Sequence, residues 1–271
     1  MASHRPKILK QTERPLSSLS KGLSLLLKLR ELSQPLGLSE ASRVLGFNKA
    51  TTFRILVTLE RYGFIEKNYQ QKNYKIGVNA FYVGSGFISG TKRAKVLEVM
   101  RKVASERGHA VTVAVLDGTS VLFIERLDSV GRLRVAVEVG ERVPAYASGS
   151  GKVLLARYKD DEIKKKFRNE KPTALTKNTI TSLPKLLSEL SMVRERGFAT
   201  NNEESIKGLC GIAVPVKNSK GWWVAALSGS YLAGSLNKKE QNDLLEKLLA
   251  GAAEIEKIGF DEVDPNLRFA S

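Results

Sequence analysis

The sequence is poor in the residues that form disulfide and metal frameworks. It has one cysteine, Cys210, and two histidines, His4 and His109. A single cysteine excludes an internal disulfide framework and is typical of a reducing cytoplasm, and structural zinc of the usual Cys/His spacing is absent. A Ser/His/Asp triad would have to use His109, which opens an apolar run and is typical of a core or edge residue. We therefore expect no enzyme, metal or cofactor.

Long apolar runs are also missing. No window approaches the roughly 18 consecutive apolar residues of a membrane span, and the first 20 residues are basic and polar, without the apolar segment of a secretory signal. The glycines of "SGSGK" at 148–152 lack the spacing of a phosphate-binding loop, which argues against nucleotide hydrolysis. We expect a cytoplasmic protein without a membrane partner.

Positive charge is abundant and unevenly placed. The net charge is +16, and residues 1–90 hold 14 Lys and Arg against 5 Glu, a net of +9 in one third of the chain. A basic excess favours acidic partners such as nucleic acid. The alternative is that the basic residues only keep the protein soluble, because net charge by itself does not specify a fold.

Changes in hydrophobic period divide the chain of 271 residues into two domains with flanking segments. We predict an α+β protein with a winged helix-turn-helix domain followed by an antiparallel sheet flanked by helices. The predicted boundaries are a disordered basic arm at 1–16, the winged helix-turn-helix domain at 17–77, a linker helix at 78–91, the sheet-containing domain at 92–262, and a tail at 263–271.

The stretch "LSEASRVLGFNKATTFRILVTLERYGFIEK" at 38–67 carries the helix-turn-helix signal. A first helix places leucines 19, 23, 26 and 27 at helical spacing, with serine 18 or 20 as its N-cap. Ser39 caps a second helix, Gly46 supplies the left-handed turn, and Asn48 caps a third helix that stops at Gly63. The period then changes to two, which predicts a hairpin, or wing.

The third helix has two different faces. Thr52, Leu56 and Leu59 fall on one side, whereas Arg54 and Arg61 project from the other with apolar neighbours. Guanidinium groups beside apolar side chains suit guanine edges and thymine methyl groups in the major groove of duplex DNA. The alternative is a three-helix bundle whose polar face meets only water. The expected DNA contacts are Lys49, Ala50, Thr51, Phe53, Arg54, Val57, Thr58 and Arg61 on the helix, and Lys67, Lys72 and Lys75 on the wing.

The second domain reads as strands and helices in alternation. Apolar runs at 110–118, 120–128, 133–140, 210–218 and 222–230 predict strands, with Asp117-Gly118 as a hairpin turn. Helices are predicted from "SGSGKVLLARY", from "LPKLLSELSMVRERG" and from the C-terminal "NKKEQNDLLEKLLAGAAEIEKIG". The start of the helix at Gly149 offers free amides and a positive helix end to a carboxylate, although its glycines could serve packing alone.

These motifs resemble the IclR family of bacterial transcriptional regulators over about residues 17–262. The resemblance is carried by "LSEASRVLGFNKATTFRILVTLERYGFIE", "YKIG", "VAVLDGTSVLFIERLDS", "LRVAVEVGERVPAYASGSGKVLLA", "RGFATNNEESIKGLCGIAVPV" and "WWVAALSGS". It implies a GAF/PAS-like effector domain, a linker helix that pairs protomers, and a homodimer that assembles as a tetramer on double-stranded operator DNA. The implied effector is a small organic acid. The rival interpretation is an effector-independent DNA-binding protein whose second domain serves only oligomerisation.

The resemblance also implies where the effector binds. By position, the effector contacts are Val135, Gly149, Ser150, Asn201, Leu209, Gly211, Ser228 and Ser230. To these we add Tyr146, which with Trp222 or Trp223 could stack an aromatic ring, the alternative being that these rings belong to the core. Two departures matter: the family's usual cysteine is replaced by Gly211, beside Cys210, and its frequent acidic residue is Asn201. The second change should relax any demand for a hydroxyl or amine on the ligand.

Overall fold

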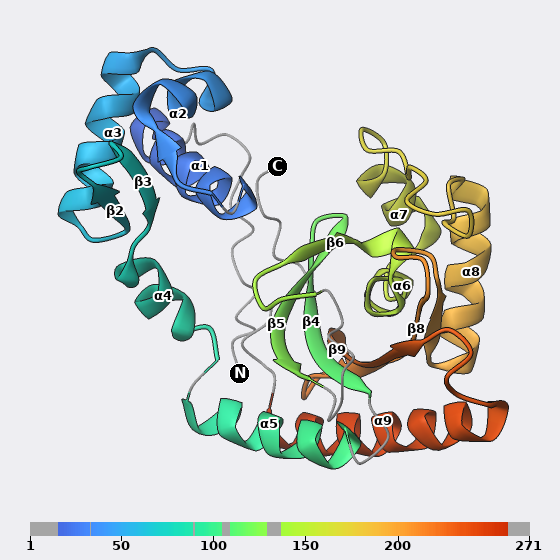
Figure 1. Cartoon of the computed structure of the whole chain (residues 1–271). Coiled ribbons are helices and arrows are strands. Elements are labelled where there is room, and N and C mark those ends of the chain that lie inside the picture. The colour runs from blue at the N-terminus through green and yellow to red at the C-terminus, as the bar shows by residue number, and fades with distance from the viewer. Residues whose placement is uncertain (1–15, 33, 89, 105–108, 129–136, 260–271) are drawn as a thin grey trace, which may run out of the picture. The chain divides into compact units, whose positions relative to one another are not determined.

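The computed structural model describes residues 16–32, 34–88, 90–104, 109–128 and 137–259, which form two compact units on either side of the boundary between Ser89 and Gly90. The first unit contains α1 (Ser17–Leu32), β1 (Leu36–Gly37), α2 (Leu38–Leu45), α3 (Lys49–Arg61), β2 (Ile65–Asn68), β3 (Asn73–Ile76) and α4 (Val78–Ser85). The predicted three helices and hairpin are present, and β1 adds a short strand to the wing in the order β1-β3-β2 (Figure 1).

The helix ends in this unit follow the predicted signals only in part. The Asn48 side chain accepts a hydrogen bond from the Thr51 amide at 2.8 Å and caps α3 as expected. Gly46 ends α2 with φ of 66°, a left-handed conformation that glycine adopts without steric cost. The predicted cap at Ser39 is wrong, because α2 begins at Leu38 after Gly37. The predicted caps of α1 are also wrong, since Ser18 and Ser20 lie inside the helix.

The buried face of α1 differs from the expected one. Leu25 and Leu29 are buried and pack with Leu56 of α3, while Leu19, Leu23 and Leu27 are about half exposed. The leucines of this helix spread over more than half of its circumference, so periodicity alone could not choose which part of that wide arc meets the core. The helix predicted over 78–91 also ends earlier, at Ser85, and α5 (Gly90–Ala104) begins the second unit.

The second unit is built on one antiparallel sheet in the order β6-β5-β4-β9-β8-β7. Its elements after α5 are β4 (Ala110–Asp117), β5 (Ser120–Leu127), β6 (Arg142–Pro144), the 3-10 turn η1 (Ala145–Ala147), α6 (Gly149–Ala156), α7 (Asp160–Lys166), α8 (Leu183–Arg196), β7 (Ala199–Asn202), β8 (Leu209–Lys217), β9 (Trp223–Leu232) and α9 (Lys238–Ile258). α5 and α9 lie side by side along one face, and α6 packs on the other with α8 behind it (Figure 1).

The sequence missed two elements of this unit, and one predicted strand needs correction. β7 and α7 were not predicted, because neither segment has a clear apolar period. The strand expected over 133–140 lies partly outside the described residues, and 137–140 form no strand; the edge strand is β6 instead.

His109 is buried directly before β4, in keeping with a core position. None of the helices in the described part of the chain has both the length and the apolarity required to cross a bilayer.

Candidate functional site

α3 presents the outward face that its sequence predicted. Thr52 and Leu56 are fully buried against the unit core, whereas Arg54 and Arg61 are exposed, together with Phe53 at 47% and Val57 at 38%. The remaining predicted helix contacts, Lys49, Ala50, Thr51 and Thr58, lie on the accessible turns of the same helix. Guanidinium groups and exposed apolar groups therefore share one surface, the combination that major-groove readout uses.

The wing is joined to this helix by a contact that the sequence did not suggest. The Tyr69 hydroxyl, near the tip of the hairpin, donates to Glu60 Oε1 on α3 at 2.9 Å. That hydrogen bond and the charge of the Glu60 carboxylate raise the pKa of Tyr69. This exposed hydrogen bond links the tip of the wing to α3.

The three wing lysines differ in their surroundings. Lys67 Nζ lies 4.9 Å from the centroid of the Tyr69 ring, and Lys75 Nζ lies 3.0 Å from Glu66 Oε2. Lys72 stands exposed in the turn between the strands, with a φ of 54°. Because its charge is presented at the tip, Lys72 is the wing lysine placed best for a phosphate.

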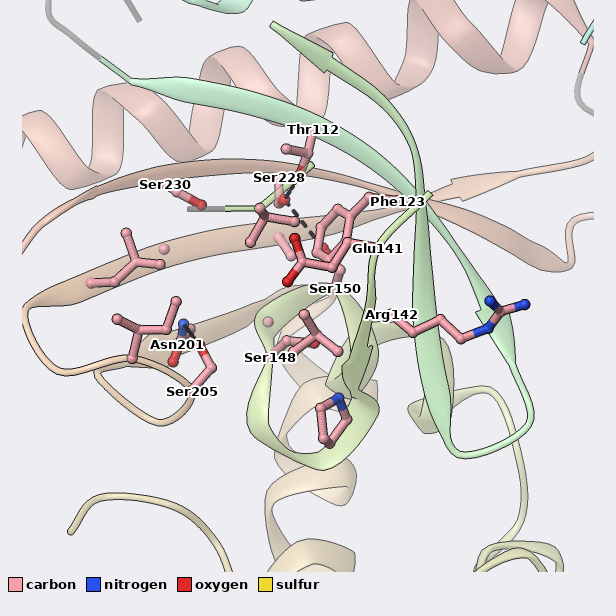
Figure 2. A pocket seen from close by; sticks show the side chains of 18 of the residues that line it. Thr112, Phe123, Glu141, Arg142, Ser148, Ser150, Asn201, Ser205, Ser228 and Ser230 are labelled. Carbon is pink, nitrogen blue, oxygen red and sulfur yellow. Dashed lines mark hydrogen bonds between the residues drawn. The ribbon is translucent and has the colours of Figure 1, made fainter. Parts of the chain in front are cut away.

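A cavity of about 250 Å³ lies in the second unit between the sheet and the start of α6 (Figure 2). Of the predicted effector contacts, seven line it: Gly149, Ser150, Asn201, Leu209, Gly211, Ser228 and Ser230. Gly211 pairs with Ser230 across β8 and β9, and Thr112 on β4 pairs with Ser228. The antiparallel register thus places these small polar side chains in one patch on the sheet.

The start of α6 forms the opposite polar wall. The Ser148 side chain caps the helix by accepting from the Gly151 amide at 3.0 Å, so the amides of Gly149 and Ser150 are those that can serve a ligand. The Ser150 hydroxyl donates to Ser228 Oγ at 3.1 Å, and Ser228 Oγ lies 2.7 Å from Thr112 Oγ1. This buried hydroxyl chain and the positive helix end favour an anionic group.

The two glycines at the start of α6 have different roles. A Cβ on Gly151 would lie 2.2 Å from the Ala145 carbonyl oxygen, so Gly151 serves close packing. Gly149 lines the cavity and also approaches Ala213 on β8, where a Cβ would meet the alanine Cβ at 3.3 Å. The packing interpretation of these glycines therefore describes Gly151 fully and Gly149 in part.

The expected aromatic contacts are not in the cavity. Tyr146 is 4% exposed, accepts a hydrogen bond from the Thr173 amide at 3.0 Å, and packs edge-on against Phe167. Trp223 packs on the core and Trp222 is exposed, so neither lines the cavity. The ring that does line it is Phe123. Val135, also expected there, lies outside the described residues.

Several lining residues were missed from the sequence, and some of them carried a signal. Thr112 is a polar residue within the apolar run "AVTVAV", and Ser148 occupies the N-cap of a predicted helix. Glu141 and Ser205 gave no such signal, because only the folded chain brings their segments to the cavity. Cys210, whose thiol pKa is raised by burial, does not line the cavity.

Comparisons with known proteins agree with both units. A family model described as "IclR helix-turn-helix domain" matches residues 18–68, and one described as "Bacterial transcriptional regulator IclR C-terminal" matches residues 91–257. The Escherichia coli HTH-type transcriptional regulator KdgR is 30% identical over 240 residues, 88% of this chain and 91% of its own.

Solved structures of similar proteins share the fold over nearly the whole chain. An IclR transcriptional regulator from Alicyclobacillus acidocaldarius has a TM-score of 0.81 at 26% identity, covering 90% of this chain and 99% of that one. An IclR homolog from Microbacterium hydrocarbonoxydans, complexed with 4-hydroxybenzoate, has a TM-score of 0.76 at 23% identity, covering 89% and 98%. At 23% identity, the second likeness concerns the fold.

Proposed function

Because the chain belongs to the IclR family of DNA-binding transcriptional regulators, and is not an enzyme, we propose that a small organic acid in the cavity of the second unit controls its operator binding. The observation that carries the proposal is the pairing of the α6 start with the hydroxyl chain of Ser150, Ser228 and Thr112 on one cavity wall. A carboxylate there would accept hydrogen bonds from the helix amides and hydroxyl groups.

The DNA-contacting surface is the outward face of α3 together with the wing. Arg54 and Arg61 supply guanidinium groups for bases or phosphates, and Lys72 supplies a charge for the backbone. We place the other predicted contacts, which lie on α3 and on β2 and β3, in the same surface.

The functional protein is proposed to be a homodimer that can form a tetramer on its operator. α4 supports the pairing of protomers, because it exposes Val78, Phe81, Tyr82 and Val83 at 61–75% of their surface. Such a run of exposed apolar side chains on one short helix is typical of an interface.

The experiment is a thermal-shift screen of small organic acids, including 4-hydroxybenzoate, followed by a gel shift with duplex DNA selected from a random pool. The acids that bind in this screen should change the affinity of the wild type for DNA. The Ser228→Ala, Ser230→Ala double variant should still bind DNA but lose that response, since alanine removes both hydroxyl groups and keeps the space filled. If no acid shifts the melting temperature or DNA affinity of the wild type, the result favours the effector-independent interpretation.

A further inference from the structure

The side-chain carboxylate of Glu141 lies in the cavity wall on the side of β5 and β6. Glu141 precedes β6, and its backbone is held on both sides: its carbonyl accepts from the Phe123 amide at 3.1 Å, and its amide donates to the Glu138 carbonyl at 3.0 Å. The side chain lines the cavity and points into it beside Phe123 and Ser150, as Figure 2 shows. Because these hydrogen bonds hold the backbone of Glu141 in place, its carboxylate belongs to the cavity wall.

The neighbouring cation does not neutralise it. The Arg142 side chain points away from the cavity in Figure 2, and its Nε donates to Asp117 Oδ2 at 2.6 Å. The carboxylate of Glu141 accepts one backbone hydrogen bond, from the Glu138 amide to Oε2 at 2.8 Å. Arg142 is the other charged residue among those that line the cavity within the described ranges, and its guanidinium is taken up by Asp117. The Glu141 carboxylate therefore has acceptor capacity to offer a ligand.

This arrangement changes the expected effect of Asn201, which stands where the family often has an acidic residue. The Asn201 side chain, 9% exposed, is occupied with its own loop: Oδ1 accepts from the Glu204 amide at 2.9 Å, and Nδ2 donates to Ser205 Oγ at 3.3 Å. Loss of an acidic residue there therefore does not leave the cavity without one. Glu141 supplies the acidic acceptor from a different segment.

We infer that Glu141 determines ligand specificity: it selects a small acid that carries a hydroxyl group away from its carboxylate, and it rejects dicarboxylates. The inference rests on the proposed function, in which the α6 wall holds the ligand carboxylate. A hydroxyl donates to the Glu141 oxygen, whereas a second carboxylate brings like charges together in a partly desolvated site, which is costly. A ligand without the hydroxyl leaves the acceptor unpaired.

The test uses two matched series with full-length protein and calorimetry: 4-hydroxybutyrate, butyrate and succinate, then 4-hydroxybenzoate, benzoate and terephthalate. In whichever series binds, the wild type should prefer the hydroxylated acid by about tenfold or more and exclude the dicarboxylate. Glu141→Gln should admit the dicarboxylate, and Glu141→Ala should reduce the preference for the hydroxyl to near unity. Glu138→Gln, an equal charge change on an exposed neighbour, should behave as the wild type.

The outcomes separate the two proposals. Binding of these acids with the same preferences in the wild type and both Glu141 variants overturns the role of Glu141 and leaves the effector cavity standing. A wild type that binds succinate or terephthalate as tightly as the hydroxylated acid also overturns it. Absence of binding by every acid to the wild type and to both variants contradicts the effector cavity itself, and the assignment of Glu141 fails with it.

Discussion

The Lys152 ammonium lies 2.6 Å from Glu204 Oε1, and both residues are buried, at 1% and 6% exposure. Lys152 belongs to α6, and Glu204 belongs, with Ser205, to the loop that directly follows β7 and its residue Asn201. Glu189 of α8 is 3.5 Å from the same ammonium and pairs with Arg196 at 2.9 Å. The buried ion pair therefore ties together two walls of the cavity.

Removing the cation should destabilise the second unit. Lys152→Met keeps the length of the side chain but leaves the Glu204 carboxylate buried without its partner, which should lower the free energy of unfolding by about 3–5 kcal/mol. Urea unfolding followed by tryptophan fluorescence measures it, because both tryptophans lie in this unit. Adding Glu204→Gln should restore part of the loss, and Lys165→Met, on an exposed turn, should cost little. A cost for Lys152→Met no larger than for Lys165→Met would contradict this view.

Arg54 should contribute to sequence recognition. With a duplex selected by the wild type, Arg54→Ala should lose about 1–3 kcal/mol of binding free energy if its guanidinium reads a base. Its loss should be smaller on unrelated DNA. Gel shifts on both duplexes measure the difference, with the exposed Arg168→Ala as the control for charge. Equal losses on selected and unrelated DNA would assign Arg54 to the phosphate backbone instead.

Lys72 should act on affinity without changing sequence preference. Lys72→Asn removes the charge while keeping a residue that tolerates the positive φ of this turn. The slope of log K against log salt concentration should fall by about 0.9, the value for one phosphate contact. The same titration on unrelated DNA should show the same change, and an unaltered slope would remove the wing tip from the interface.

The exposed face of α4 should hold protomers together. Phe81→Glu places a charge among apolar neighbours, so the mass measured by light scattering should shift from an oligomer toward the monomer. The control is Met192→Glu, which changes an exposed apolar residue on α8 and should leave the mass unchanged. A monomeric wild type, or an unaltered mass for Phe81→Glu, would argue against α4 as the interface.

Strong local signals were enough to predict much of the fold. Asn48, Gly46 and Gly197 mark helix ends where the structure has them. The predicted hairpin between β4 and β5 is present, but its turn residues are Gly118 and Thr119, one position later than predicted, because Asp117 pairs with Ser120. Weak signals failed: the leucines of α1 spread over more than half of the helix, and β7 and α7 are short and polar. A very wide apolar arc does not tell which part of it meets the core.

The candidate site divides in the same way. The two faces of α3 follow from a period of 3.6, and the shared orientation of Ser228 and Ser230 follows from a period of two, so the sequence by itself determined the outward face of α3 and the serine patch. Only the tertiary structure decided that Tyr146 belongs to the core, that Lys152 is buried against Glu204, and that Glu141 reaches the cavity. Such contacts join segments far apart in the chain, and local periodicity holds no record of which segments the sheet brings together.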